Sequence, residues 1–584
     1  MKNNLRLQIE GLAGMALAVA MLSSPSGAEV SGWKPLDQGA NWTAEARKDF
    51  YSRDQGSRLI PLRWISALKQ PNGQPFMAGS LSRYGFLPNE GSNPPGLPVG
   101  FTIDSGSGGR SLGITCSACH TRQIEVGGKS YLVDGGPAIA DFQSFLTDLD
   151  SAVNKAITDN AAFADFAQSV LGPMPPPEQE AALKEALRAW YTPFNTLNKH
   201  ALPKGKPWGP GRLDAVSMIF NRLTGLDIGP PPSYMIEKNI MPADAPVRYP
   251  FLWNAPIQDQ TQWPGFADNG DNILALSRNL GEVYGVFAVF HPEKDEGKLL
   301  GFDYRANNSA NFPGLEALED LIWKIGPPKW PWPVDQALAS TGKAIYERKT
   351  AQGGCVECHW IKPDIKLGSP RLLNKHTWAT PVQDVGTDSR EYSILTRIVA
   401  TGVLEGAQIP LLTQPLQATD KAANVLKTAV MGSVLQHLTP AVLEAKVEAK
   451  VKLLRSLLGP KIEVLEELKG VFKMPAGPAV PPPAYESRVL EGIWATAPYL
   501  HNGSVPSLAD LLEPAAKRTA EFKVGPAYDP VKVGLAAEQT KFNFTLKTTD
   551  CSDRASGNSR CGHEYGANLT VEEKKALLEY LKIL

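Results

Sequence analysis

Two short segments of the chain combine thiol and imidazole side chains at a fixed spacing. They are Cys116-Ser117-Ala118-Cys119-His120 and Cys355-Val356-Glu357-Cys358-His359. In a C-x-x-C-H segment, the two thiols can reach the two vinyl groups of one porphyrin, and the adjacent imidazole can ligate its iron. The motifs therefore predict two covalently bound haem c groups and a redox function. The predicted cofactor-binding residues are Cys116, Cys119, His120, Cys355, Cys358 and His359.

The alternative for these side chains is a zinc site built from the two C-x-x-C pairs. The chain has six cysteines, and four of them lie in the two motifs. The pairs are far apart in sequence, and a histidine follows each pair directly. This arrangement favours haem attachment over zinc.

The N-terminal residues have the pattern of a secretory signal peptide. Lys2 and Arg6 precede an apolar run over residues 11–22, and Ser26-Gly27-Ala28 resembles a cleavage site. We therefore expect a signal peptide over residues 1–28. The run is too short to cross a bilayer as a helix, although a retained anchor is the alternative. No later segment is apolar enough to span a membrane, so we expect a periplasmic or secreted protein of a Gram-negative bacterium, without a transmembrane segment in the mature chain.

Composition sets the expected fold class. The formal net charge is -1, which implies no nucleic-acid partner. With Gly 52 and Pro 49, the chain is rich in residues that favour loops. We expect a mainly α fold with few short strands, in which two cytochrome c-like haem domains are embedded in long ordered loops. The remaining cysteines, Cys551 and Cys561, can form a disulfide in an oxidising compartment.

The proline-rich stretch over residues 326–333 is the clearest boundary, because proline disfavours both helix and central strand. It predicts an N-terminal haem domain over residues 29–328, with the active haem and a substrate pocket. A C-terminal cytochrome c-like haem domain follows over residues 329–584. A helix over residues 335–348 leads into the second motif. Its expected buried face comprises Ala339, Gly342, Ile345 and Tyr346.

Two further helices can be predicted from capping signals. One begins at Thr439, with Pro440 in its first turn, and ends at Gly459-Pro460. The other begins at Thr570, where Glu573 completes a capping box. The apolar faces of both helices are expected to belong to the core.

The sixth ligand of each iron decides its chemistry, because an open position can bind oxygen or peroxide. His120 and His359 are each assigned as one ligand. For the second haem we favour His563 over Met474, because a neighbouring disulfide and a capped helix would hold that imidazole still. The metal ligands are thus His120, His359 and His563. The lone histidines expected to be ordinary surface or core residues are His200, His291, His376 and His437.

For the first haem, no second ligand is evident. The segment between Tyr249 and Tyr284 is instead rich in aromatic residues, namely Phe251, Trp253, Trp263 and Phe266. Apolar rings over an iron would exclude strong ligands and leave room for oxygen and a hydrophobic substrate. The alternative is that these rings are ordinary core.

Four further segments carry a family resemblance. Residues 495–504 (ATAPYLHNGS) look like the T-A-P-Y-x-H-x-G segment of bacterial dihaem cytochrome c peroxidases and their relative MauG. The match to secreted dihaem rubber oxygenases and unsaturated fatty acid dioxygenases is closer. It includes residues 50–57, the first C-x-x-C-H motif, residues 134–137 and residues 562–566. The resemblance is spread over most of the mature chain.

The resemblance implies roles for individual residues. His120 would be the proximal ligand of the active N-terminal haem, and His359 and His563 would ligate the C-terminal haem from both sides. Tyr499 and His501 would lie near the C-terminal haem, where His501 is not expected to bind iron. An aromatic residue, Phe266 or Phe251, would shield the oxygen site. Trp360 could lie between the haems or serve only in packing. The candidate catalytic residues are Phe266, Phe251, Trp253, Trp263 and Tyr499.

The leading hypothesis is an exported dihaem dioxygenase. It would insert O2 into a hydrophobic unsaturated molecule or polymer, giving a fatty acid hydroperoxide or cleaved polyisoprene. The alternatives are a fatty acid hydroperoxide isomerase (diol synthase), a dihaem cytochrome c peroxidase, for which Glu282 is a candidate, and an electron-transfer cytochrome. The chain length argues against a plain carrier. An electron-donor protein is a further possible partner. The candidate substrates are a fatty acid, polyisoprene or another terpenoid; Arg212, Arg222 or Arg278 could bind a carboxylate.

Overall fold

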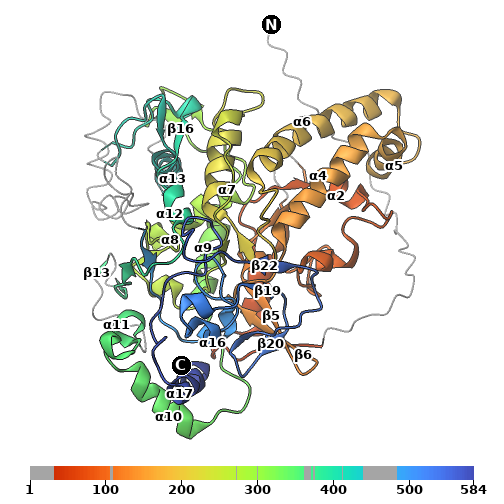
Figure 1. The fold of residues 1–584 in the computed structure, drawn as a ribbon. Coiled ribbons are helices and arrows are strands. Elements are labelled where there is room, and N and C mark those ends of the chain that lie inside the picture. The colour runs from red at the N-terminus through yellow and green to blue at the C-terminus, as the bar shows by residue number, and fades with distance from the viewer. Residues whose placement is uncertain are drawn as a thin grey trace.

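The computed structural model describes residues 32–104, 109–270, 272–298, 300–360, 370–371, 375–410, 412–438 and 483–584 (Figure 1). Short helices and many two-stranded ladders are joined by long loops. The α-helices are α1 (Ala44–Ser52), α2 (Leu62–Ala67), α3 (Cys116–Cys119), α4 (Phe142–Thr158), α5 (Asn160–Leu171), α6 (Pro177–Ala201), α7 (Ala215–Arg222), α8 (Asn272–Gly285), α9 (Phe312–Ile322), α10 (Gln336–Tyr346), α11 (Val356–His359), α12 (Arg390–Ile394), α13 (Ala422–Leu438), α16 (Leu508–Leu511) and α17 (Val571–Ile583).

The strands are short, and none of those in the described part exceeds six residues. They are β1 (Trp33–Pro35), β2 (Ile60–Pro61), β3 (Phe101–Asp104), β4 (Ser111–Ile114), β5 (Thr121–Val126), β6 (Lys129–Asp134), β7 (Arg212–Leu213), β8 (Val247–Arg248), β9 (Gln260–Thr261), β10 (Ala267–Asp268), β11 (Glu293–Lys294), β12 (Phe302–Asp303), β13 (Pro370–Arg371), β14 (Lys375–His376), β15 (Val382–Gln383), β16 (Ile398–Ala400), β17 (Thr419–Lys421), β18 (Tyr485–Glu486), β19 (Glu521–Lys523), β20 (Tyr528–Asp529), β21 (Gly534–Leu535) and β22 (Thr545–Lys547).

Two three-stranded sheets flank the first motif. In one, β4 lies between β2 and β3; in the other, β6 pairs parallel to β1 and antiparallel to β5. Strand β4 ends just before the motif, and β5 begins directly after His120, so α3 lies on the connection between the sheets. Gly100 permits the tight fit of this connection. Its φ is +76°, and a Cβ there would lie 2.0 Å from the Ala118 nitrogen.

The second motif lies in a small helical unit formed by α10, α11 and α17, at the lower left of Figure 1. The expected helix before this motif is confirmed as α10, which Asp335 caps through the amides of Ala337 and Leu338. The expected capping box of Thr570 and Glu573 opens α17. Gly342 lets the two helices touch, because a Cβ there would lie 2.0 Å from the Ala576 carbonyl oxygen.

The predicted boundary at 328/329 lies in an extended segment, but the hydrophobic cores do not follow it. One core packs α4, α5 and α6, seen at the upper right of Figure 1, on the β2–β4–β3 sheet. A second combines α7 and α8 with α13, and a third combines β5, β6 and α9 with η11 (Ile493–Thr496) and α17. The last two cores therefore contain residues from both sides of the boundary, and the division into two haem domains remains a prediction.

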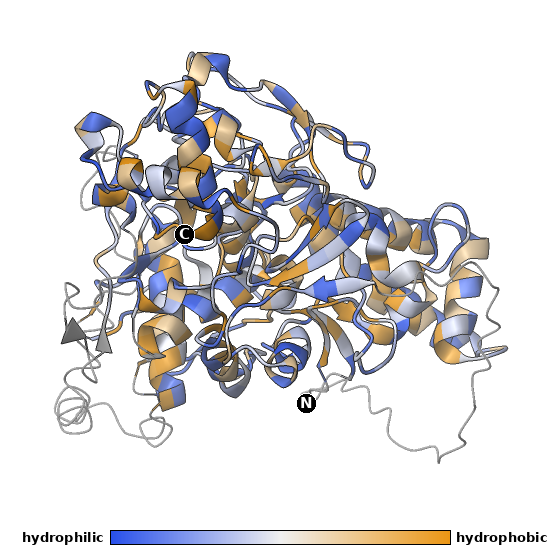
Figure 2. Ribbon diagram, turned by 90° about the horizontal axis from the view of Figure 1, so that it is seen from below, coloured by the Kyte–Doolittle hydropathy of each residue, from blue (hydrophilic) through white to orange (hydrophobic). Residues whose placement is uncertain are grey.

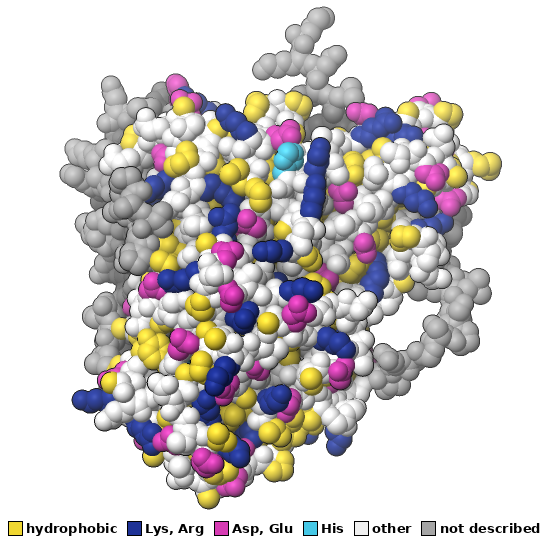
Figure 3. Space-filling model, in the orientation of Figure 1, with side chains coloured by type: hydrophobic (Ala, Val, Ile, Leu, Met, Phe, Trp, Pro, Cys, Tyr) yellow, Lys and Arg dark blue, Asp and Glu magenta, His cyan; other side chains and the backbone are white. Residues whose placement is uncertain are grey.

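Most helices in Figure 2 carry both hydrophobic and hydrophilic residues. Within the described residues, no helix is both long and apolar enough to cross a bilayer. The face shown in Figure 3 mixes acidic and basic side chains, as expected from a net charge of -1. The signal peptide over residues 1–28, the helix beginning at Thr439 and the candidate ligand Met474 lie outside the described residues.

Candidate functional site

A large cavity adjoins the second motif. Its volume is about 1230 Å³, including the part open to solvent, and Cys355, Cys358, His359 and His563 all line it. One cavity therefore brings together both thiols of the motif and two imidazoles. Its other walls are largely apolar and include leucines from α16 and α17.

The His359 ring is held in a defined orientation. Its Nδ1 lies 2.7 Å from the Arg488 carbonyl oxygen. A backbone carbonyl accepts only, so Nδ1 carries the proton and the lone pair lies on Nε2. Burial lowers the pKa of His359, which favours the neutral ring that ligates a metal. A second partner that fixes the tautomer in this way is typical of metal-binding histidines.

His563 faces His359 across the cavity. Their ring centroids are 6.0 Å apart, and the ring planes are inclined by 50°. With metal–nitrogen bonds of about 2 Å and ring centroids about 1 Å behind the ligating nitrogens, two imidazoles on opposite sides of one ion would have centroids about 6 Å apart. Burial lowers the pKa of His563 to about 3, and the charge of Arg518 acts in the same direction.

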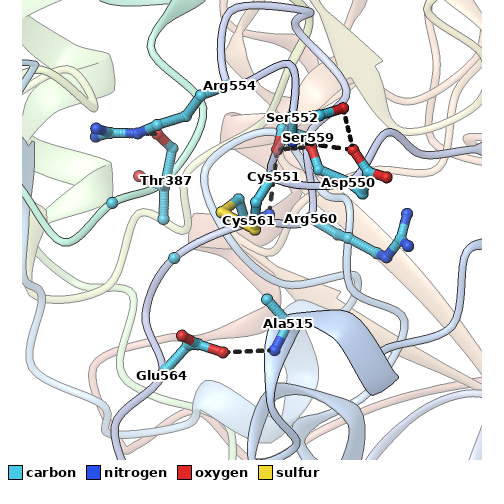
Figure 4. Close-up of a disulfide and its surroundings, with 12 residues drawn as sticks. Thr387, Ala515, Asp550, Cys551, Ser552, Arg554, Ser559, Arg560, Cys561 and Glu564 are labelled. Atoms are coloured by element: carbon cyan, nitrogen blue, oxygen red, sulfur yellow. Dashed lines mark hydrogen bonds between the residues drawn. A yellow bond between two sulfur atoms is a disulfide. The ribbon is translucent and has the colours of Figure 1, made fainter.

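The loop that carries His563 is anchored at several points (Figure 4). Cys551 and Cys561 form a disulfide with an S–S distance of 2.09 Å. Arg518 donates to the carbonyl oxygens of Gly562, at 2.7 Å, and His563, at 2.9 Å. Glu564 accepts from the Ala515 amide at 2.7 Å. These contacts hold the imidazole still without involving its ring.

Two buried arginines at this cavity fit the carboxylates of a haem. Arg248 and Arg488 both line it. The Arg488 guanidinium donates to Gln258 Oε1 at 2.7 Å and lies 4.0 Å from the centroid of Phe251. Its Nη1 is buried and has no hydrogen-bond partner among the residues that the structure describes. The guanidinium also lies 3.6 Å from Glu486 Oε1, so its charge is already paired. An unsatisfied buried donor such as this Nη1 is costly, so a hydrogen-bond acceptor here, such as a carboxylate, would be stabilised. The donor set and this unsatisfied donor together fit haem c.

The first motif is more deeply enclosed. Burial raises the pKa of both Cys116 and Cys119 to about 12, so these thiols are protonated in the protein without haem. Burial lowers the pKa of His120 to about 4, and the charges of Arg488 and Arg278 act in the same direction. The ring that packs on His120 is Tyr249, with centroids 6.0 Å apart. All four motif cysteines are free of disulfides.

The two C-x-x-C pairs do not form a common site. In the part of the chain that the structure describes, no three His, Cys, Asp or Glu side chains are grouped to hold a metal ion. The described residues therefore provide no tetrahedral thiolate site for the zinc alternative.

The other histidines are engaged elsewhere. Three lie within 3.5 Å of a carboxylate: His200 at Glu237, His291 at Asp227 and His437 at Glu316. His501 stacks on Tyr485, with centroids 3.9 Å apart, in the wall of the second-motif cavity. The side chain of His376 is outside the description. Among the described side chains, His120 is therefore the only histidine at the first motif.

The five candidate aromatic residues do not share one pocket. Phe251, Trp263 and Tyr499 line the cavity of the second motif. Trp253 stacks on Phe251 and donates to the Glu491 carbonyl oxygen at 2.7 Å. Phe266 alone lines a different, small cavity of about 270 Å³. These placements leave Phe266 as the candidate for the first motif.

Three polar side chains line the small cavity beside Phe266, and nothing in the sequence indicated that they lie together. Glu282, Gln262 and Arg278 line it together with aliphatic side chains. Glu282 accepts from Gln262 Nε2 at 2.7 Å, and burial raises its pKa, opposed by Arg278. The charge of Glu282 also raises the pKa of Cys116, so this cavity lies within electrostatic reach of the first motif.

The arginines proposed for a carboxylate have internal partners. Arg278 pairs with Glu319 at 2.8 Å, and Arg212 donates to Asn558 at 2.7 Å. Arg222 lies over the Phe287 ring, 4.9 Å from its centroid. Trp360 accepts from the Tyr346 hydroxyl through its carbonyl oxygen at 2.8 Å, a contact that serves the second motif. Sequence reasoning missed Arg248, Arg488 and Arg518, because no spacing links them to either motif.

A known sequence family matches a short part of the chain. The sequence family described as "RoxA-like, cytochrome c-like" matches residues 484–523, which include Arg488, Tyr499 and Arg518. This match supports a RoxA-type cytochrome at a coarse level and, at that level, haem c binding and an oxidoreductase role.

Two proteins of Sinorhizobium fredii (strain NBRC 101917 / NGR234) are similar over longer stretches. "Uncharacterized protein y4iJ" is 30% identical over 599 residues, which cover 93% of this chain and 92% of that protein. "Uncharacterized protein y4iM" is 31% identical over 353 residues, or 57% of this chain and 63% of that protein. The chain belongs to the family of y4iJ and carries a RoxA-like, cytochrome c-like segment.

Proposed function

We propose that this protein is an exported dihaem c-type dioxygenase that adds O2 to a hydrophobic substrate with a carbon–carbon double bond. The RoxA-like match supports an oxidoreductase of this type. The disulfide of Cys551 and Cys561 supports an oxidising compartment, the periplasm or the exterior.

One observation supports different roles for the two motifs. His359 faces a second imidazole, His563, whereas His120 faces Tyr249 and no other described imidazole. A haem with two histidine ligands relays electrons, and a haem with one can bind a small molecule. The second motif is thus the electron relay, and the first is the catalytic site.

Haem c, when bound, supplies an iron centre that can exchange electrons and bind oxygen. The side chains of the chain define the surroundings. Phe266 and aliphatic residues give the small cavity an apolar wall on which an apolar group can pack. The Arg488 carbonyl oxygen keeps the His359 lone pair on Nε2. Both motif histidines are neutral because of burial, as ligation requires.

A second function, peroxidase activity, is favoured by Glu282. Burial raises the pKa of Glu282, which favours the protonated carboxyl group, and a positioned carboxylic acid can deliver a proton to a peroxide oxygen. Gln262, whose Nε2 donates to Glu282, would orient the carboxyl group. In the dioxygenase, the same carboxyl group would have no comparable leaving oxygen to protonate.

The deciding experiment adds oleate or a polyisoprene emulsion to the purified holoprotein in an oxygen electrode, without peroxide, and identifies products by mass spectrometry. Oxygen uptake with a hydroperoxide or a cleaved carbonyl product supports the dioxygenase and names its substrate. Without uptake, conversion of a fatty acid hydroperoxide to a diol would indicate the isomerase. Peroxide-dependent oxidation of a reduced donor would indicate the peroxidase. Absence of all three leaves an electron-transfer cytochrome.

A further inference from the structure

Five aromatic residues lie in continuous contact beside the second-motif cavity, mostly edge to face. We call Tyr131, Trp330, Trp332, Trp494 and Tyr528 the aromatic stack. Trp494 is fully buried, whereas Trp330 and Trp332 are half-buried. Trp494 lies 5.1 Å from Trp330 and 5.6 Å from Trp332, centroid to centroid. Trp332 also stacks on Tyr528 at 5.8 Å, with ring planes inclined by 17°, and meets Tyr131 at 5.4 Å. The stack therefore extends from the interior to the surface.

The inner end of the stack touches the cavity wall. Ile493, next to Trp494, lines the cavity, as does Tyr499. The Tyr499 hydroxyl lies 3.3 Å from the Trp494 carbonyl oxygen, and the Tyr528 hydroxyl donates to the same oxygen at 2.8 Å. The cavity wall and the first ring of the stack are thus adjacent in the fold.

The surroundings favour tryptophan over tyrosine as the electron carrier. A tyrosine that loses an electron must also lose its proton, and the hydroxyls of Tyr499 and Tyr528 point at backbone carbonyls, which are not bases. An indole can lose an electron and keep its proton. The Trp494 Nε1 group donates to the Pro328 carbonyl oxygen at 3.1 Å. That oxygen can stabilise a positive charge on the ring without removing the proton.

Ring contacts select the outer end. The Lys582 ammonium lies 5.2 Å from the centroid of Trp330, but it forms an ion pair with Glu579, so its net charge effect on the ring is small. Trp332 contacts two electron-rich rings, Tyr131 and Tyr528, and is nearly parallel to Tyr528. Trp330 meets Tyr528 only edge-on, at 6.4 Å. The exposed edge of Trp332 is therefore the favoured place for electrons to enter from outside.

We propose that the aromatic stack is an electron-transfer route between the second-motif cavity and the surface, with Trp494 as its inner and Trp332 as its outer carrier. The route rests on the proposed function in that it requires an oxidisable haem iron in the cavity. It would deliver electrons from a one-electron reductant at the surface. Without such a reductant or a substrate, the electrons would come from Trp332 itself.

When Trp332 itself supplies the electrons, hydrogen peroxide is the oxidant and the reaction balances. The peroxide O–O bond breaks, and two electrons and two protons convert the peroxide to two waters. Trp332 supplies the two electrons; a carbon–oxygen bond forms between the indole and a water, which together release two protons. The net result is hydroxylated Trp332 and one water for each peroxide consumed.

The test treats the holoprotein with an equimolar amount of hydrogen peroxide, without reductant, and maps oxygen adducts by peptide mass spectrometry. We expect an adduct on Trp332 that is lost in Trp494→Leu and lost when cyanide occupies the open position of the first-motif iron, where peroxide would react. Because Trp494 is buried and its loss can impair folding, Trp494→Phe provides a second variant, which keeps an aromatic ring but is much harder to oxidise. The control residue is Trp323, which is 42% exposed and outside the stack.

An adduct on Trp332 no greater than on Trp323, or one that persists in folded Trp494→Phe, would overturn the route. The outcome is independent of oxygen insertion, because no unsaturated substrate is present. If oxygen uptake fails but Trp332 is oxidised through Trp494, the route stands and the dioxygenase falls. If uptake succeeds and Trp332 stays unmodified, the reverse holds.

Discussion

The Arg488 carbonyl oxygen lies 2.7 Å from His359 Nδ1, while the guanidinium of the same residue lies over the Phe251 ring. Burial lowers the pKa of His120, and the Arg488 charge lowers it further. One residue thus orients the ligand of the second motif through its backbone and acts on the ligand of the first through its charge. This relationship links two motifs that are more than two hundred residues apart in sequence.

Replacing the Arg488 side chain should therefore shift a potential rather than abolish ligation. In Arg488→Met the carbonyl oxygen remains, but a buried positive charge near both sites is lost. The oxidised iron is then less disfavoured, so both reduction potentials should fall. A change of about 1.4 kcal/mol in charge stabilisation corresponds to about 59 mV for one electron. Spectroelectrochemical titration of the holoprotein measures this shift.

Arg488→Lys should keep most of the original potential, because it retains the charge. Arg390→Met is the matched control: Arg390 is half-buried and pairs with Asp244 at the surface, 2.8 Å away. Equal potentials in Arg488→Met and wild type would contradict the electrostatic role.

His563 is expected to be the sixth ligand of the second haem. His563→Gly should convert that haem from low spin to high spin, because the ring opposite His359 is removed. Electron paramagnetic resonance of the ferric protein detects the change as a new high-spin signal. Met474→Leu distinguishes the two candidates considered from the sequence. A low-spin spectrum in His563→Gly together with a high-spin one in Met474→Leu would assign the ligand to Met474.

The local features of this site could be predicted from the sequence, and the long-range ones could not. The C-x-x-C-H motifs, the capping box at Thr570 and the helix before Cys355 are each encoded within a few residues. Arg518 clamps the His563 loop from 45 residues away, and Arg488 meets His359 across 129 residues. Such contacts depend on the path of the loops, which have no periodicity to reveal it.

The aromatic residues between Tyr249 and Tyr284 could also be placed only in part from the sequence. Composition alone predicted rings near an iron, and Phe251 and Trp263 do line a cavity with two motif cysteines. That cavity belongs to the second motif, not to the first, and only Phe266 lies beside Glu282. The number of residues between an aromatic side chain and a motif did not indicate which of the two sites that side chain would line. The loops over residues 247–270 pass between the two sites.

The disulfide should stabilise the loop that presents His563. Cys551 and Cys561 are separated by 10 positions, and closing so short a loop should contribute about 3 kcal/mol to the free energy of unfolding. Cys551→Ser with Cys561→Ser should lower the denaturant midpoint accordingly. It should also increase the high-spin fraction of the second haem, because the loop is less constrained. An unchanged spin state would show that Arg518 and the Ala515–Glu564 contact suffice.

Asp227 should make the stability of the protein depend on pH. Burial raises the pKa of Asp227 to about 7, opposed by Arg222, whereas an unfolded aspartate has a pKa of about 3.9. The folded state therefore holds this proton more tightly, and its stabilising contribution, complete below about pH 4, is lost as the pH rises to about 7. Asparagine does not titrate, so the free energy of unfolding of Asp227→Asn should fall less than that of the wild type between about pH 4 and pH 7. The difference between the two falls should be up to a few kcal/mol.

The comparison of variant and wild type isolates Asp227 from its neighbour. His291, whose Nε2 lies 3.5 Å from Asp227, has its pKa lowered to about 4 by burial. The stabilising contribution of neutral His291 is therefore lost as the pH falls from about 6.5 to about 4, opposite to the direction for Asp227. His291 is present in both the wild type and Asp227→Asn. Urea midpoints measured between pH 4 and pH 8 give both curves. Parallel curves would mean that Asp227 is ionised in the folded state throughout.

Glu282 separates the two enzymatic candidates. If the carboxyl group delivers a proton to peroxide, Glu282→Gln should lower peroxide-dependent turnover by about 10²–10⁴-fold, the usual contribution of a positioned acid. Oxygen uptake with an unsaturated substrate should change little, because that reaction does not require protonation of a leaving oxygen. The matched control is Glu316→Gln, which alters a half-exposed carboxylate beside His437. Loss of oxygen uptake together with peroxide turnover would instead make Glu282 a shared component of the first-motif site, acting through Gln262 and the packing around Phe266.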